Sequence, residues 1–322
     1  MTTCPVTDAR PPRPLAFRAL RSLFLLVTLT AVVATPAWAA TKSKSKSKSK
    51  VRAATSALVV KSNVALVVDQ DTGEILVSKN ADTVTPIASL TKLMTALVVI
   101  DGRLPMDEML EIGDEDHDRE KHTTSRLRTG TRLTRGDLML LSLMSSENRA
   151  ALALGRHYPG GRTKFVAAMN AKARSLGMAS TRFADPAGLS SDNVSTARDL
   201  LRLLSAADAV DLIRNDSTQT EGTVMVRGRP LQFVNTNRLV RSASRDWNIG
   251  LQKTGFTNEA GRCLVMRATT AERRLSMVFL DSVGTLTRFA DASRVRQHLL
   301  RQASAKRVPV STPVALGPKT AS

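Results

Sequence analysis

The chain has 322 residues, of which 42% are hydrophobic, and this apolar content excludes a wholly disordered protein. A formal net charge of +19 would suit a nucleic-acid-binding protein, but an aromatic content of 3% leaves few side chains on which bases could stack, so we expect no nucleic-acid partner. We interpret the charge instead as attraction toward anionic wall polymers and lipid head groups.

Residues 1–39 have the three parts of a signal peptide for export. Arginines, among them Arg18 and Arg21, precede an apolar run from Leu23 to Ala34, and Ala37-Trp38-Ala39 follows as a small-x-small cleavage motif. Because this run is shorter than the roughly 20 residues that span a bilayer, we expect cleavage and no stable transmembrane anchor. The sequence therefore predicts a protein of the periplasm or cell envelope.

Residues 40–54 are predicted to be a linker, because they contain a Lys-Ser alternation that repels itself and cannot form a core. Within it, Lys42–Lys50 is a candidate for contact with anionic surfaces of the envelope. Residues 304–322 combine prolines with small side chains and are predicted to be a disordered tail. The folded unit is therefore expected at residues 55–303.

Within the folded unit, strand patterns at both ends enclose a long helical stretch. Val64–Asp69 and Glu74–Lys79 predict a β-hairpin, and Ser89–Ile100 has apolar residues at helical spacing. Further helices are predicted at Arg135–Met144, Asn148–His157, Arg162–Leu176, Thr196–Ala206 and, last in the chain, Leu286–Arg301. Strands are predicted at Thr223–Arg227, Leu231–Val234, Ile249–Thr254, Arg262–Thr270 and Leu275–Asp281. This order predicts an α+β fold with an antiparallel sheet whose strands come from both ends of the chain.

The motif Ser89-Leu90-Thr91-Lys92 opens the first predicted helix. Residues i and i+3 share a helix face, so the Lys92 amine lies within reach of the Ser89 hydroxyl. A serine alcohol needs a base to remove its proton, and lysine serves as that base where burial or nearby positive charge lowers its pKa. The helix N-terminus also directs backbone N–H groups toward a developing oxyanion. The motif therefore predicts a serine nucleophile.

A second motif, Ser146-Glu147-Asn148, lies between two predicted helices. The Ser146 hydroxyl can relay a proton from Lys92 toward a leaving amine, and Asn148 can hold Lys92 and a substrate amide by hydrogen bonds. The motif is equally suited to be a helix N-cap. A rival, Ser191-Asp192-Asn193, follows a loop-like segment further along the chain, and we prefer Ser146 as the catalytic serine.

The third motif, Lys253-Thr254-Gly255, closes a predicted strand. A strand end can present an ammonium group and a hydroxyl to a substrate carboxylate, and Gly255 lets the backbone approach a ligand closely. Lys253 by itself could equally be a solvated lysine that protects a sheet edge.

In this order, the three motifs resemble those of the penicillin-recognising serine enzymes. The segments 144–151 and 253–263 are similar to low-molecular-mass penicillin-binding proteins of the D-alanyl-D-alanine endopeptidase branch. The segments 185–189 and 195–200 are similar to the D-Ala-D-Ala peptidases of the same family. The resemblance spans residues 57–300 approximately. It implies the transpeptidase fold that penicillin-binding proteins share with β-lactamases, in which an antiparallel sheet flanked by helices joins a mostly helical lobe.

The resemblance also implies roles for the motif residues in a D,D-peptidase. The catalytic side chains would be Ser89, Lys92 and Ser146. Substrate contacts would come from Asn148, Lys253, Thr254 and Gly255. The oxyanion hole would be formed by the backbone N–H groups of Ser89 and Phe256. The implied partners are the stem peptides of peptidoglycan and β-lactams, and penicillin would acylate Ser89.

Two D,D-peptidase activities fit this chemistry. The family's carboxypeptidases usually carry a β-rich domain and an amphipathic helix after the catalytic part, and the residues after 303 leave no room for either. We therefore expect an endopeptidase that cleaves cross-links between wall peptides, with a carboxypeptidase that removes terminal D-Ala as the alternative.

Two further classes are less well supported by the sequence. A class A β-lactamase needs a glutamate that activates the deacylating water, and Arg182 stands where that glutamate is expected. A non-catalytic envelope binding protein remains an alternative, although all three motifs are intact.

We expect neither a metal site nor a cofactor. Residues 113–122 contain several carboxylates and two histidines, but His117 and His122 are five residues apart, so they do not share one helix face. We interpret this segment as a solvated acidic loop.

Overall fold

The structure is a computed structural model that describes residues 58–242 and 247–307. The predicted signal peptide and Lys/Ser-rich linker lie outside the described residues, and so does most of the predicted tail. These three assignments therefore stay predictions.

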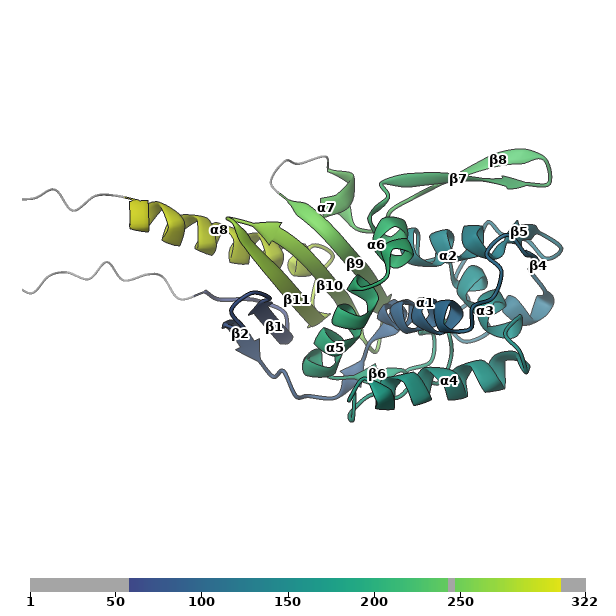
Figure 1. The fold of residues 1–322 in the computed structure, drawn as a ribbon, viewed down its shortest axis with the longest axis horizontal. Coiled ribbons are helices and arrows are strands. Elements are labelled where there is room, and N and C mark those ends of the chain that lie inside the picture. Colours follow the sequence, from purple (N-terminus) through teal and green to yellow (C-terminus); the bar gives the residue numbers. More distant parts are fainter. Residues whose placement is uncertain (1–57, 243–246, 308–322) are drawn as a thin grey trace, which may run out of the picture. The chain divides into compact units, whose positions relative to one another are not determined.

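The described residues alternate between strands and helices (Figure 1). The strands are β1 (Val64–Asp69), β2 (Ile75–Lys79), β3 (Thr85–Pro86), β4 (Met109–Glu111), β5 (Arg132–Thr134), β6 (Val194–Ser195), β7 (Glu221–Val226), β8 (Arg229–Val234), β9 (Asn248–Thr257), β10 (Gly261–Thr270) and β11 (Arg273–Ser282). The helices are α1 (Lys92–Asp101), α2 (Arg135–Met144), α3 (Asn148–Arg156), α4 (Gly161–Ser175), α5 (Ala197–Asp208), α6 (Asp211–Thr218), α7 (Arg238–Arg241) and α8 (Thr287–Arg307). Two 3₁₀ turns, η1 (Ala88–Thr91) and η2 (Asp114–Asp116), complete the set.

The main sheet has five antiparallel strands in the order β2-β1-β11-β10-β9. The first strand pairs with the last, with Val64 opposite Leu280. The sheet therefore combines strands from both ends of the folded unit, as the sequence predicts. This pairing places β9, which carries Lys253, at one edge.

Side chains that alternate along the strands separate two apolar layers. Ala65 and Val67 of β1 face the layer that also contains Phe289 and Val295 of α8. Their neighbour Leu66 faces the larger core, which includes the helical lobe. Both faces of the sheet are thus covered, one of them mainly by α8.

The helical lobe begins with capped helices. Thr134 accepts a hydrogen bond from Asp137 N at 3.0 Å and the Asp137 side chain accepts from Thr134 N at 3.3 Å, a reciprocal pair that fixes the start of α2. Thr196 accepts from Asp199 N at 3.1 Å at the start of α5. These local bonds satisfy backbone donors that a helix leaves free, and they explain why both starts lie close to the predicted positions.

Several predicted elements need correction. The predicted strands Thr223–Arg227 and Leu231–Val234 are present as β7 and β8, each with slightly different bounds, and they form a two-stranded ribbon separate from the main sheet. Helix α6 was not predicted, because it is short and mostly polar; it owes its place to packing against β9. Helix α8 continues to Arg307, past its predicted end and into the predicted tail.

Candidate active site

Ser89 lies in a tight turn between β3 and α1. The preceding residue, Ala88, has a left-handed backbone with φ of 47°, and the 3₁₀ turn η1 then leads directly into α1. A non-glycine residue with positive φ is strained and persists only where its surroundings hold it. The surroundings here include the loop at Gly188, where a Cβ would lie 2.0 Å from Ala88 O. The loop at Gly188 therefore packs tightly against the turn and holds its conformation, which places Ser89 at the start of the helix.

Lys92 is completely buried and is held by three acceptors. Its Nζ donates to Ser89 Oγ at 2.8 Å, to Asn148 Oδ1 at 2.7 Å and to Ala187 O at 2.6 Å. Burial lowers the pKa of Lys92 from 10.5 to about 7, although Asp185, Glu147 and Asp118 act in the opposite direction. The amine next to Ser89 is thus populated in its unprotonated form near neutral pH.

The Ser146-Glu147-Asn148 segment joins α2 to α3. Ser146 adopts a left-handed backbone with φ of 60°, and the Glu147 side chain caps α3 by accepting from Arg149 N at 3.2 Å. Asn148 Oδ1 accepts from Lys92, while its Nδ2 donates to Thr123 Oγ1 at 2.9 Å. The segment therefore contains a helix cap, which is Glu147, and it brings Asn148 into contact with Lys92.

Lys253 approaches Ser146 from the main sheet. Its Nζ donates to Ser146 Oγ at 2.9 Å and to Thr254 O at 3.0 Å, and the side chain is completely buried. Burial lowers the pKa of Lys253 well below its ordinary value, and the neighbouring Lys92 adds to this effect. The hydrogen bond that the structure gives Ser146 Oγ thus comes from Lys253, whereas the sequence had suggested Lys92.

Strand β9 passes close to the Ser89 turn. A Cβ on Gly255 would lie 3.0 Å from Ile87 O and 3.1 Å from Ser89 N, which is tighter than most real contacts. Glycine is therefore required for this approach. The close approach places the backbone of β9 beside Ser89 N, and the next residue in the strand is Phe256. Phe256 is half exposed, with the Arg262 guanidinium 4.2 Å from the centre of its ring.

The loop 185–193 packs against Lys92 and supplies one of its hydrogen-bond acceptors, Ala187 O. Asp185 accepts hydrogen bonds from the backbone N–H groups of successive residues, including Ala187 at 2.7 Å and Gly188 at 2.7 Å. These bonds fix the Ala187 carbonyl that holds Lys92. The rival motif ends in this loop, where the Asn193 side chain is buried and bonded to Asp185. Asn193 therefore stabilises the loop.

Three residues near the motifs were missed by the sequence analysis. They are Thr123, Thr236 and Arg288. Thr236 Oγ1 shares a 2.6 Å hydrogen bond with Thr254 Oγ1, and it lines a cavity of about 380 Å³ together with Arg288. Arg288 is buried, its Nε has no hydrogen-bond partner among the described residues, and burial lowers its pKa to about 10. No local motif marks these positions, because they meet the site only through the fold.

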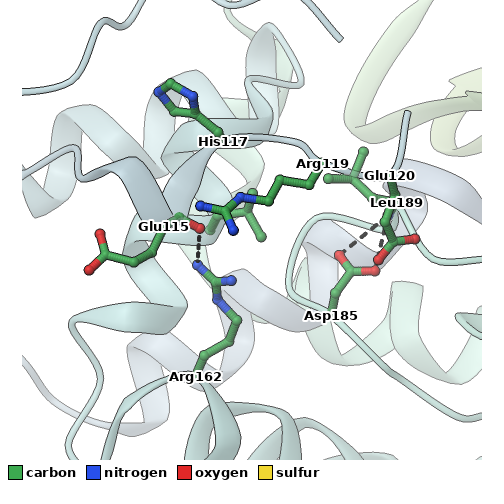
Figure 2. Close-up of a pocket in the computed structure, with 8 residues that line it drawn as sticks. Glu115, His117, Arg119, Glu120, Arg162, Asp185 and Leu189 are labelled. Carbon is green, nitrogen blue, oxygen red and sulfur yellow. Dashed lines mark hydrogen bonds between the residues drawn. The ribbon is translucent and has the colours of Figure 1, made fainter. Parts of the chain in front are cut away.

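The acidic segment 113–122 lies beside the loop that carries Asp185. Figure 2 shows Glu120 with its carboxylate next to Asp185, in a cavity of about 250 Å³. Burial and then the Asp185 charge raise the pKa of Glu120. The segment is only partly solvated, because Asp116 is buried and paired with Arg156 at 2.8 Å. Among the residues that the structure describes, no group of His, Cys, Asp and Glu side chains is arranged to hold a metal ion.

Comparisons with known proteins agree with this geometry. A sequence profile described as D-alanyl-D-alanine carboxypeptidase matches residues 50–284. A D-alanyl-D-alanine endopeptidase of Pseudomonas aeruginosa is 53% identical over 240 residues, which cover 74% of this chain and 77% of the relative. A D-alanyl-D-alanine endopeptidase of Escherichia coli is 50% identical over 239 residues, which cover 74% of this chain and 76% of the relative.

A solved structure shows the same fold. It is a penicillin-binding protein of Listeria monocytogenes in its cefotaxime-bound form, with a TM-score of 0.65 and 30% sequence identity, and the match covers 76% of this chain and 98% of that one. This likeness confirms the fold class predicted from the sequence. In the described part of the chain, none of the helices combines the length and apolar character needed to cross a bilayer.

Proposed function

The chain belongs to the D-alanyl-D-alanine carboxypeptidase family of serine peptidases, and we propose that it cleaves D-Ala-containing cross-links between the stem peptides of peptidoglycan. The family membership agrees with the resemblance seen in the sequence. The endopeptidase activity is supported by the two relatives named above, which are at least half identical to this chain over the matched residues.

One observation carries the proposal. Lys92 Nζ lies 2.8 Å from Ser89 Oγ inside a fully buried environment, with a pKa of about 7. An amine in this state can accept a proton at neutral pH, which an ordinary lysine cannot do to a useful extent. The pair therefore has both the geometry and the protonation state of a nucleophile and its base.

The reaction that we propose has two halves. In the first, Lys92 takes the proton of Ser89 Oγ while this oxygen bonds to the carbonyl carbon of D-Ala. The oxyanion is held by the N–H groups of Ser89 and Phe256. The C–N bond then breaks, and Ser146 Oγ gives its proton to the leaving amine. In the second half, water attacks the ester carbonyl and its proton passes through Ser146 Oγ to Lys253. The ester C–O bond then breaks, and Ser89 Oγ takes back from Lys92 the proton that it gave up, so the acid and the free Ser89 hydroxyl are released.

The two lysines have different tasks in this scheme. Lys92 acts as the base. Lys253 donates to Ser146 Oγ, so it can replace the proton that Ser146 gives to the leaving amine. The substrate is oriented along β9 by Lys253 and Thr254, and Gly255 lets it approach closely. Asn148 holds Lys92 through its side-chain oxygen, while its amide nitrogen donates to Thr123. Arg288 is a further candidate for binding a substrate carboxylate, since it is a buried guanidinium in the cavity beside Thr236.

The same chemistry makes β-lactams covalent inhibitors. A β-lactam would acylate Ser89, and Arg182 occupies the position where a class A β-lactamase has its deacylating glutamate. We therefore propose that the penicilloyl enzyme hydrolyses slowly. Location in the periplasm is part of the proposal, and it is supported by the signal-peptide pattern in residues 1–39 and by the wall substrate.

The proposed activity can be tested with purified cross-linked muropeptide dimers. We expect the parent enzyme to convert dimers into monomers and Ser89→Ala to leave them intact, as measured by mass spectrometry of the products. Release of free D-Ala with the dimers left intact would assign a carboxypeptidase instead.

Labelling by fluorescent penicillin provides a second measurement. The parent should be labelled stably, whereas Ser89→Ala should not be labelled. Rapid nitrocefin turnover by the parent would contradict slow deacylation, and equal labelling of parent and Ser89→Ala would exclude Ser89 as the nucleophile.

A further inference from the structure

A basic groove lies between the β7–β8 ribbon and the loop that precedes β5. Its volume is about 510 Å³. It is lined by Arg126, Arg128, Thr131, Val226, Arg227, Arg229, Pro230 and Leu231. The lining thus contains four guanidinium groups and no carboxylate. None of these four arginines forms an ion pair with an Asp or Glu side chain of residues 58–242 or 247–307.

Two of the arginines hold the walls of the groove together. Arg227 of the ribbon donates to Thr129 O at 2.9 Å, and Arg126 of the loop lies over the ring of Phe233 at 4.0 Å from its centre. The other two, Arg128 and Arg229, are exposed, one on each wall. A ligand that enters the groove therefore meets free guanidinium groups on both sides.

Thr131 provides a second indication of a ligand. Its side chain is completely buried and lines the groove, yet its hydroxyl has no hydrogen-bond partner among the described residues. Buried hydroxyl groups nearly always have a partner. The hydroxyl oxygen is enclosed, so a polar ligand group in the groove would supply the missing partner once the Thr131 side chain rotates toward it.

Both walls of the groove begin at the active site. The loop starts at Thr123, which accepts from Asn148 Nδ2 at 2.9 Å. The ribbon ends at Thr236, which is hydrogen-bonded to Thr254 at 2.6 Å. In Figure 1 the ribbon extends over α2 toward β5.

The distance fits a peptide. Arg229 lies seven positions before Thr236, which corresponds to about 24 Å of extended chain. An extended peptide of about seven residues has the same length. A cross-linked pair of stem peptides is therefore long enough to extend from Thr236 to the arginines.

We propose that this groove is an extended substrate subsite that binds the free carboxylates of a wall stem peptide. The inference rests on the proposed peptidase function. Guanidinium groups pair with carboxylates through two parallel hydrogen bonds, so exposed Arg128 and Arg229 can each hold one carboxylate. The groove then contributes affinity for long, anionic, cross-linked substrates.

The test measures binding separately from cleavage. In a Ser89→Ala background, the affinity for a muropeptide dimer with free carboxylates is measured by isothermal titration calorimetry at low salt. Adding Arg128→Gln and Arg229→Gln should raise Kd by about 5- to 30-fold, which is the effect of two exposed ion pairs of favourable geometry. The matched control, Arg174→Gln with Arg301→Gln, removes the same charge from exposed sites on α4 and α8 and should leave Kd unchanged.

A second ligand makes the test independent of the groove substitutions. The same dimer, amidated at its free carboxylates other than the terminal one of D-Ala, should bind the Ser89→Ala protein more weakly, by a similar factor. Equal Kd values for the groove and control variants, or for the free and amidated dimers, would overturn the proposal. So would a groove variant that loses binding to phosphatidylglycerol vesicles but keeps its affinity for the dimer, because the groove would then be a lipid site. Failure of the proposed function would appear elsewhere, as absence of dimer cleavage by the parent.

Discussion

The protonation state of Lys92 can be tested through the pH dependence of acylation. Burial lowers its pKa from 10.5 to about 7. At pH 7 the unprotonated fraction is then about one half, compared with about 0.03% for an unperturbed lysine. Since the unprotonated amine is the base, burial increases the amount of active base about a thousandfold.

The acylation rate should rise with pH. Lys92 is active when it is neutral, so the acylation rate should be half-maximal near pH 7, approach its plateau about one pH unit higher, and fall as pH decreases. Well below the pKa the fall should approach tenfold per pH unit, which leaves about 1% of the plateau rate at pH 5. The assay is stopped-flow measurement of the second-order rate of Ser89 acylation by a fluorescent penicillin between pH 5 and 9.

A variant checks that the inflection belongs to Lys92. The Glu147 charge raises the pKa of Lys92, so Glu147→Gln should move the inflection to lower pH. Glutamine retains the side-chain oxygen that caps α3, so the fold should be preserved. A rate that stays constant from pH 5 to 7, an inflection near 10, or an upward shift in Glu147→Gln would refute the assignment of Lys92 as the base.

Three other predictions concern single positions. Gly255→Ala should slow acylation about 10- to 100-fold, because the Cβ of the new alanine would lie 3.1 Å from Ser89 N. An unchanged rate in the same penicillin assay would show that β9 shifts without cost to make room. Arg288→Gln should raise KM for D-Ala-containing peptides by about tenfold with a smaller change in kcat, and an unchanged KM would exclude it as a carboxylate ligand. Asp185→Ala should lower the free energy of unfolding by about 3 kcal/mol, because several backbone N–H groups lose their acceptor. A midpoint of urea unfolding equal to that of the parent would contradict a stabilising role of Asp185 in the loop.

Local patterns in the sequence were sufficient to place most of the secondary structure and to predict that Ser89 and Lys92 are in contact. The strand Val64–Asp69 and the helix Arg135–Met144 have the bounds that their periodicity predicts. Ser89 and Lys92 are three residues apart, and in a helical turn this spacing by itself brings the hydroxyl and the amine together. Such features depend on neighbours in the chain, so they can be deduced without a tertiary structure.

The environment of that pair was decided by the tertiary structure. The low pKa of Lys92 arises from burial in the folded core. Its amine is held in place by a third acceptor, Ala187 O, which lies 95 positions away in the chain. Lys253 reaches Ser146 because β9 forms the edge of a sheet whose order depends on the pairing of β1 with β11. The residues that contact Lys92 and Lys253 belong to distant segments of the chain. The positions of these segments result from packing of the whole core, so local spacing in the sequence does not determine them. Sequence therefore determined which residues could react, and the fold determined their protonation and their contacts.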